Sequence, residues 1–346
     1  MAISGHVLSA VQFGFITGTF LFAILLVADR FSPSKIFLVC ALLGAACNIP
    51  LFSEKLSVFG LLSARFGTGF FLAGIYPVGM KIAADHFQNG LGKALGLLVG
   101  ALVLGTASPY LLNAFEFSNN YTHVLLITSA LAMLGGIVVG LGVADGPYRK
   151  PLSKLQLNAA PQLFKIKAFK KAAIGYFGHM WELYAFWVFV PFALKIYEQL
   201  HSSELLIDTW TFVSIAVGSV SCVLGGYLAA NYGSKKIATV SLSVSGFFCL
   251  VSPLLFLAPL PIFLLSLLLW GMFVVADSPQ FSTLVANAVP AELKGTALTM
   301  TNCIGFALSI LSIQLLNFAS NIINPTWLFL LLLPGPITGI LYFRMK

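Results

Sequence analysis

Charged residues are scarce in this chain. Only 9% of its 346 residues are Asp, Glu, Lys or Arg, and 59% are hydrophobic. A soluble domain has about 25% charged residues. Because much of any folded surface contacts water, a soluble protein of this length could not hide so much apolar surface. The composition excludes an ordinary soluble domain and indicates a polytopic protein whose solvent is lipid.

Several chemical signatures are also missing. The five cysteines lie inside apolar runs, their number is odd and no CxxC pair occurs, so they read as small core residues and not as a disulfide framework or a metal site. No GxxxxGK[ST] loop occurs, so ATP does not drive this protein directly. His179 and Glu182 are metal-ligand types, but no HExxH motif or third ligand accompanies them. We therefore expect no cofactor, no metal and no enzymatic activity. The start "MAISGH" has no basic residue, so it does not read as a signal peptide.

Long apolar runs fill most of the sequence. A membrane-spanning helix needs about 20 mostly apolar residues, and a bilayer admits only helices or closed barrels. Runs of this length are too long for barrel strands, so they predict an all-α polytopic bundle of about eleven transmembrane helices. The predicted spans are 7–28, 36–53, 57–84, 92–116, 121–144, 170–195, 206–231, 236–257, 261–287, 295–318 and 325–343.

The positive charges predict the orientation. Of the 19 Lys and Arg residues, 16 fall on one side of this topology, and seven of these lie between residues 149 and 171. The positive-inside rule places that side, with the C-terminus, in the cytoplasm, and a bacterial inner (plasma) membrane is the expected location. The net charge of +8 follows from this asymmetry and does not suggest a nucleic-acid partner. The basic stretch 163–171, "LFKIKAFKK", fits either contact with the anionic inner leaflet or a solvated linker.

The chain repeats itself. "GIYPVGMKIAADHF" (74–87) aligns with "ADSPQFSTLVANAV" (276–289), and "ADRFSPSK" (28–35) aligns with "AANYGSKK" (229–236), at offsets of 201 to 203 residues. Two similar halves are a common transporter plan. We predict an N-terminal half of five helices (1–144), a basic cytoplasmic linker (145–169) and a C-terminal half of six helices (170–346). On this count the first half lacks its first helix.

The loops after the matching helices carry a family signature. "LLVADRFSPSK" (25–35) and "GYLAANYGSKK" (226–236) resemble the G-x-x-x-D-R-x-G-R-K loop of the major facilitator superfamily of secondary transporters, which has twelve helices in two halves. Glycines of that pattern are replaced at Leu25 and Ser32, and its charged pair at Ala230 and Asn231. The positions that the resemblance assigns to a cytoplasmic gating loop are Asp29, Arg30, Lys35, Gly226, Gly233 and Lys235.

Asp29 has a physical reason to act in such a gate. At the end of a helix, its carboxylate can pair with a neighbouring cation or with a helix N-terminus in one state and separate from it in another. The alternative is a short charged loop with no gating role.

The first half offers two candidate cavity residues. Arg65, in "RFGTGFFLAG", resembles an arginine of the family's fourth helix and lies about 12 Å below the outer loop at 1.5 Å per residue. A cation at that depth should face a cavity or a partner, although a snorkelling side chain is the alternative. Tyr76 occupies the repeat position of the second-half candidates described next. Gly92, Gly96 and Gly100 form a stripe that predicts close helix packing.

The second half carries two deep acids. His179 and Glu182 are three residues apart, so they share one helix face near the middle of a span. A bare carboxylate there is strongly disfavoured, so Glu182 should be protonated, paired or wet, and we interpret it as a proton or substrate-charge site modulated by His179. The alternative is a polar pair that fixes helix packing. Trp181, Tyr184 and Trp187 are expected to pack.

Asp277 is the second deep acid. Pro279 follows it and removes a helix hydrogen bond, and such discontinuities often mark binding sites. Asp277 with Gln280 is therefore a second candidate within the proton or substrate cavity.

These features predict a secondary active transporter that works by alternating access with proton coupling. The expected partners are a small-molecule substrate, protons and the lipid bilayer, and the expected state is a monomer. Two acids and one arginine fit an organic cation, a zwitterion or an anion carried with protons. The alternative is a non-transporting membrane scaffold or a truncated remnant of such a carrier.

Overall fold

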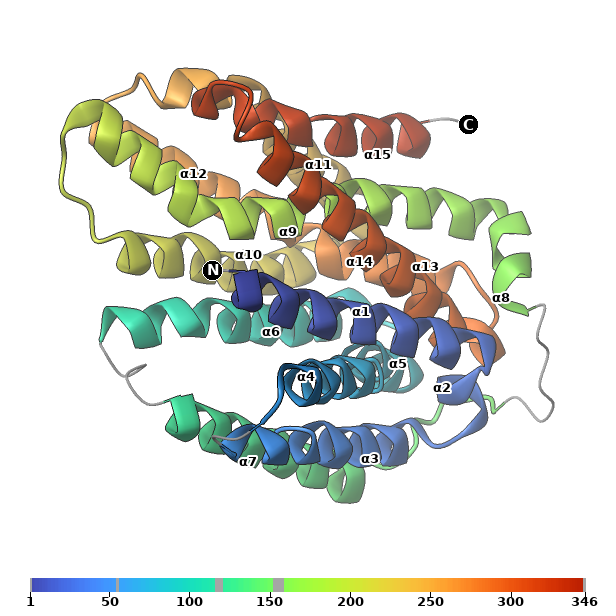
Figure 1. The fold of residues 1–346 in the computed structure, drawn as a ribbon. Coiled ribbons are helices and arrows are strands. Elements are labelled where there is room, and N and C mark those ends of the chain that lie inside the picture. The colour runs from blue at the N-terminus through green and yellow to red at the C-terminus, as the bar shows by residue number, and fades with distance from the viewer. Residues whose placement is uncertain (1, 54–55, 116–120, 152–158, 345–346) are drawn as a thin grey trace. The chain divides into compact units, whose positions relative to one another are not determined.

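The computed structural model describes residues 2–53, 56–115, 121–151 and 159–344 (Figure 1). Every regular element in those residues is helical, which confirms the all-α prediction. The α-helices are α1 (Ala2–Ile24), α2 (Val27–Arg30), α3 (Pro33–Ala46), α4 (Val58–Leu72), α5 (Tyr76–His86), α6 (Leu91–Ala114), α7 (Tyr121–Gly142), α8 (Ala159–Gln162), α9 (Lys167–His201), α10 (Ile207–Tyr232), α11 (Ser234–Leu255), α12 (Leu260–Ala276), α13 (Ser278–Asn287), α14 (Lys294–Ala319) and α15 (Pro334–Arg344). Of the 3-10 helices, η1 (Ile49–Phe52) follows α3 and η5 (Pro325–Leu332) precedes α15.

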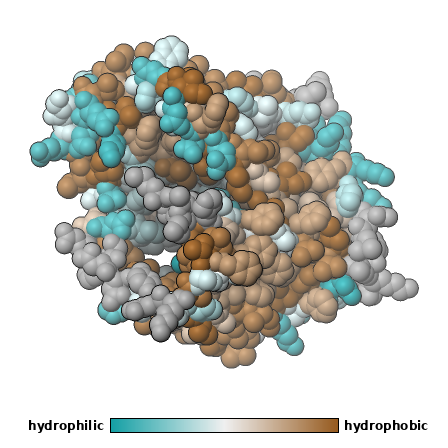
Figure 2. All heavy atoms as spheres, in the orientation of Figure 1, coloured by the Kyte–Doolittle hydropathy of each residue, from teal (hydrophilic) through white to brown (hydrophobic). Residues whose placement is uncertain are grey.

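Most of these helices suit a membrane. Nine helical stretches of the described residues are long and apolar enough to cross one, and α1 adds a shorter apolar stretch at Ser9–Ile24. The predicted span 170–195 lies within α9, a helix of 35 residues that carries His179 and Glu182. Large apolar side chains such as Phe59 and Leu141 are about four-fifths exposed, at 81% and 79%. Apolar residues also cover much of the face shown in Figure 2. Such a surface belongs in lipid, so this is an integral multi-pass membrane protein.

The helices form two compact units. Unit 1 comprises Met1–Asn89, Asn119–Phe169 and Val285–Phe306. Within it α1 packs on α4, and α3 packs on α7 and α4 (Figure 1). Gly14 and Gly69 lie at the α1–α4 contact, where the backbone of the facing helix fills the space that a Cβ would need. Small residues therefore allow this close approach.

Unit 2 comprises Gly90–Ser118, Lys170–Leu284 and Ala307–Lys346. Within it α6 lies along α10, and α12 packs on α10 and α11 (Figure 1). A Cβ on Gly96 would lie 2.6 Å from the carbonyl oxygen of Cys222, and one on Gly100 would lie 3.1 Å from that of Ser219. The prediction that the glycine stripe is a packing face is confirmed, because α10 occupies the space over it.

Two helices are interrupted at matching places in the repeat. α12 ends at Ala276 and α13 begins at Ser278, so the predicted break at Asp277 is confirmed. α4 ends at Leu72 and α5 begins at Tyr76, with Pro77 in its first turn. Proline lacks the N–H that would continue the hydrogen-bond ladder, which explains both breaks.

The compact units do not follow the predicted halves, because each unit gathers segments from both. The division into 1–144, 145–169 and 170–346 rests on the internal repeat and stays a prediction. Part of its linker, 152–158, lies outside the described residues.

Candidate functional site

The helix break in unit 2 brings two of the predicted residues together. His179, on α9, places Nδ1 2.8 Å from Oδ1 of Asp277, which follows the last residue of α12. Both side chains are essentially buried, His179 at 1% exposure and Asp277 at 0%. The two groups form an ion pair when the imidazole is protonated, although their orientation does not meet the geometry of a hydrogen bond. Two titratable groups are therefore in contact with each other inside unit 2.

Aromatic rings hold the imidazole in this position. The centre of the His179 ring lies 5.7 Å from that of Tyr176, one turn earlier on α9, and 6.2 Å from that of Phe281 on α13. Because α13 begins directly after Asp277, the break at the acid also brings Phe281 to the imidazole.

Several polar atoms of this pair and of Gln280, three residues after Asp277, have no hydrogen-bond partner among the described residues. Nε2 of His179, Oδ2 of Asp277 and both amide atoms of Gln280 are buried without a hydrogen bond among the described residues. Gln280 is fully buried, and a Cβ on Gly92 would lie 3.1 Å from its Oε1. Buried polar atoms nearly always have a hydrogen-bond partner, so a group without one calls for a bound water, a bound ion or a functional role as its explanation. The cluster of His179, Asp277 and Gln280 is therefore the most under-bonded of the predicted sites. We call it the polar cluster.

Glu182 has a different environment in the same unit. Its Oε1 accepts hydrogen bonds from Trp270 Nε1 at 2.8 Å, from Cys249 Sγ at 3.2 Å and from the hydroxyl of Ser245. These donors come from α11 and α12, and Glu182 is 1% exposed. The carboxyl is thus buried but satisfied on one oxygen.

His179 and Glu182 share a helix face but have different partners. His179 meets Asp277, whereas the hydrogen bonds to Glu182 come from Ser245, Cys249 and Trp270. The proposed modulation of Glu182 by His179 stays a prediction.

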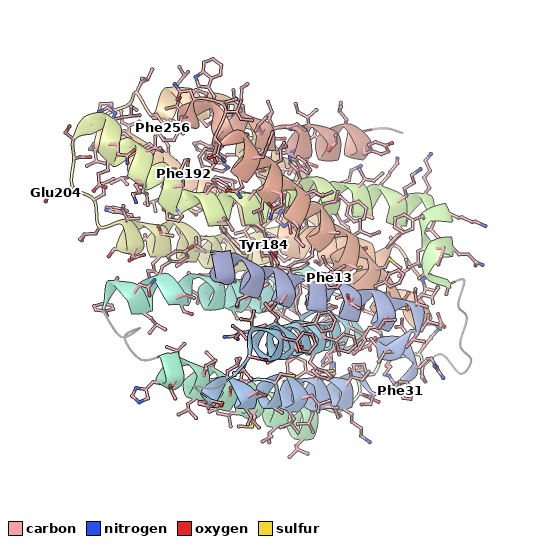
Figure 3. The ribbon with its side chains drawn as sticks, in the orientation of Figure 1. Phe13, Phe31, Tyr184, Phe192, Glu204 and Phe256 are labelled. Atoms are coloured by element: carbon pink, nitrogen blue, oxygen red, sulfur yellow. The ribbon has the colours of Figure 1, made fainter. Side chains whose placement is uncertain are left out.

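The neighbouring aromatic residues of α9 pack. Trp181 Nε1 donates to the carbonyl of Leu331 at 3.1 Å. Tyr184, labelled in Figure 3, contacts the Trp187 ring with 5.1 Å between centres. These contacts agree with the expectation that the three side chains pack.

Arg65 and Tyr76 both lie in unit 1. Arg65 is partly buried on α4, and its Nε has no hydrogen-bond partner among the described residues. Within that part of the chain, no carboxylate lies at ion-pair distance from it. Tyr76 is the first residue of α5 and is partly buried. The cavity roles of both residues stay predictions.

Asp29 in unit 1 binds the start of α14. Its Oδ1 accepts from the backbone N–H of Gly295 at 2.9 Å, and its Oδ2 accepts from the N–H and hydroxyl of Thr296 at 2.7 and 2.6 Å. Lys81 Nζ lies 3.8 Å from Asp29 and 2.5 Å from both carboxylate oxygens of Asp85. All three charged side chains are buried. Asp29 therefore contacts both a helix N-terminus and a cation, the two kinds of partner named from the sequence.

Burial and these partners act on Asp29 in opposite directions. Burial raises the pKa of its carboxyl above the ordinary value, while the Lys81 ammonium and the donors of Thr296 and Gly295 lower it, and the net shift is upward. The contact between Asp29 and α14 is therefore sensitive to protonation.

The other predicted gating residues lie around the two signature loops. Arg30 Cζ is 5.3 Å from the centre of the Phe31 ring, and Lys35 is exposed. Gly233 ends α10 with φ +80°, a conformation that glycine adopts easily. Lys235 is exposed near the start of α11. A Cβ on Gly226 would lie 2.7 Å from the carbonyl oxygen of Gly92, so this glycine is needed for packing.

The family model for the Major Facilitator Superfamily matches residues 2–343. This chain belongs to that superfamily. No curated protein sequence matches it.

Solved transporters have the same fold as this superfamily member. It is similar to the human organic anion transporter MFSD10 (TETRAN) at 14% identity and a TM-score of 0.79, over 99% of this chain and 83% of that one. It is also similar to the E. coli fucose:proton symporter FucP at 14% identity and a TM-score of 0.72, over 99% of this chain and 90% of that one. At such low identity these likenesses show the fold alone.

Sequence reasoning missed several partners in this superfamily member. Lys81, Ser245 and Trp270 were not among the candidate residues. The spacing of Lys81 and Asp85, four residues apart on one helix, is a signal that could have identified their pair. The donors to Glu182 have no comparable signal, because they come from α11 and α12, far along the chain.

Proposed function

We propose that this protein carries a small solute across the membrane by alternating access and couples that movement to protons. Membership of the superfamily makes it a membrane transporter. The observation that supports coupling is the buried contact between His179 and Asp277, 2.8 Å apart, on a chain segment where the amide of Gln280 is also buried without a partner among the described residues.

The pair can store a proton because the charge on each group affects protonation of the other. With one proton shared, the pair is either an imidazolium beside a carboxylate or a neutral imidazole beside a carboxylic acid. A second proton leaves an imidazolium beside a neutral acid, so the pair changes its net charge in a buried place. That change alters the electrostatic environment of any solute next to it, and this is the coupling that we propose.

Gln280 is the proposed solute contact. Its amide offers a donor and an acceptor with no partner among the described residues. Hydroxyl, carboxylate and ammonium groups of a solute can each bond to such an amide. Glu182 is the second candidate for the proton, and Arg65 and Tyr76 are proposed to line the path of the solute in the first half.

Asp29 is the proposed gate. While its carboxylate binds the N-terminus of α14, unit 1 keeps α2 and α14 together. Breaking this contact would let the two helices separate during alternating access. Arg30, Lys35, Gly226, Gly233 and Lys235 belong to the same two loops and are proposed to assist.

Coupling can be tested in proteoliposomes that contain a pH-sensitive dye. The first solutes are fucose and a panel of organic anions, chosen from what the two structurally similar transporters carry. We expect at least one transported solute to move protons in the wild type, and both Asp277→Asn and His179→Gln to abolish the proton signal. Glu204→Gln, at an exposed acid labelled in Figure 3, is the matched control and should behave like the wild type. Transport of a solute by the wild type with no proton movement would refute the coupling.

A further inference from the structure

We propose that an anionic phospholipid binds in a groove of unit 2, at a site separate from the polar cluster. The groove has a volume of ≈ 510 Å³ and is lined by residues of α10, α11 and α12. Its apolar walls include Leu224, Leu228, Val240 and Phe273, and Lys236 is the charged residue among those that line it.

The groove lies on helices that suit a membrane. α10 and α11 are candidate spans, and α12 belongs to a third. Leu224, Leu228 and Val240 are about half exposed, at 50%, 46% and 46%. A concave apolar surface with half-exposed walls on membrane-spanning helices faces lipid, so an acyl chain is the natural occupant. Because lipid tails are as apolar as leucine, the apolar walls bind the acyl chains of anionic and neutral phospholipids equally well.

The positive charge at one end of the groove favours an anionic phospholipid. α10 ends at Tyr232, Gly233 turns the chain, and α11 begins at Ser234, so Lys236 lies in the first turn of α11. Its Nζ is 4.9 Å from the centre of the Tyr232 ring, which also lines the groove. Basic groups between membrane helices bind anionic headgroups.

The helix start adds a second attraction for an anion. No side chain caps the N-terminus of α11, because the capping position is Gly233. Its first backbone N–H groups and the positive end of the helix dipole therefore favour a negative charge beside Lys236. The charge asymmetry of the sequence predicts that this end is cytoplasmic, where anionic lipids are attracted to basic side chains.

A lipid uses both parts of the site, whereas a free phosphate uses only one. The phosphate of the headgroup would bind at Lys236 and the helix start, and an acyl chain would follow the groove past Val240. A substitution in the groove, away from the charge, therefore separates a lipid site from a simple anion site.

The test is native mass spectrometry of the purified full chain, titrated in detergent with phosphatidylglycerol or phosphatidylcholine. We expect the wild type to bind phosphatidylglycerol more tightly. Lys236→Gln should weaken that binding about fivefold, the effect of one lysine near an anionic headgroup, and Lys236→Arg should retain it. Val240→Trp should weaken it as well, because the indole fills the groove.

Matched controls use residues away from the groove. Lys195→Gln removes an exposed lysine from the end of α9, and Leu250→Trp adds an indole to an exposed position of α11. Both should bind phosphatidylglycerol like the wild type. Equal binding of the two lipids, or full affinity in Lys236→Gln, would overturn the proposal. Loss of binding in Lys236→Gln with full affinity in Val240→Trp would indicate a free-anion site and would also overturn it.

Discussion

Adding one methyl group at Gly96 should destabilise this protein, whereas the same change at Gly105 should not. Both glycines lie on α6. A Cβ on Gly96 would lie 2.6 Å from the carbonyl oxygen of Cys222 and 3.4 Å from the Cα of Gly226, both backbone atoms of α10. A Cβ on Gly105 meets nothing within 4 Å.

The two substitutions share one contribution to the free energy of unfolding and differ in another. Replacing glycine by alanine inside a helix stabilises it by about 0.4–1 kcal/mol, because the unfolded chain loses freedom. Overpacking costs about 1–3 kcal/mol when a backbone must move to make room. We therefore expect Gly96→Ala to lower the free energy of unfolding by about 1–3 kcal/mol relative to Gly105→Ala, since the helix term cancels between them.

The assay is thermal unfolding of the purified protein in one detergent, with both variants measured beside the wild type. Gly105→Ala should unfold at or slightly above the wild-type temperature, and Gly96→Ala below it. Equal midpoints for the two variants would contradict this prediction, because the close approach of α6 and α10 would then not limit the packing.

Two further predictions concern the buried charges of unit 1. Lys81→Met should lower the free energy of unfolding by about 3–5 kcal/mol, because Asp85 is left buried without the ammonium that lies against it. Adding Asp85→Leu should recover most of this stability. Thermal unfolding of both variants measures the difference, and equal instability of the single and double variants would contradict the prediction. Burial raises the pKa of Asp29 in the folded state, so the folded state binds the proton more tightly than the unfolded chain does. Protonation of Asp29 therefore stabilises the fold at low pH, and this stabilisation is lost as pH rises from the ordinary pKa of 3.8 through the folded-state pKa. The melting temperature of the wild type minus that of Asp29→Asn should therefore fall over this pH range, and a difference that rises would contradict the assignment.

Much of the fold follows from the sequence because lipid imposes simple rules. The apolar runs predict the helices, since a membrane leaves backbone groups no partners except those within the helix. The break at Asp277 was predictable because Pro279 cannot donate a backbone hydrogen bond. The close-packing face of α6 was predictable from Gly92, Gly96 and Gly100, because small residues at helical spacing allow close approach, whereas its partner α10 was not.

The sites were predictable only in part. The sequence singled out His179, Glu182 and Asp277, because ionisable residues inside apolar helices are costly. It joined His179 to Glu182 by spacing, whereas the structure places His179 beside Asp277, almost a hundred residues later in the chain. Spacing reveals neighbours on one helix, but contacts between helices depend on rotation and packing that no local pattern encodes. The Lys81–Asp85 pair was not among the candidates, although its two residues lie four apart on α5.

We propose that the buried pair of His179 and Asp277 couples the movement of a solute to protons. The most direct test measures solute and proton flux together in proteoliposomes, for the first solute that the wild type transports. Asp277→Asn should still exchange that solute across the membrane but should no longer accumulate it when a pH gradient is imposed. Accumulation by Asp277→Asn at the wild-type level would contradict the account.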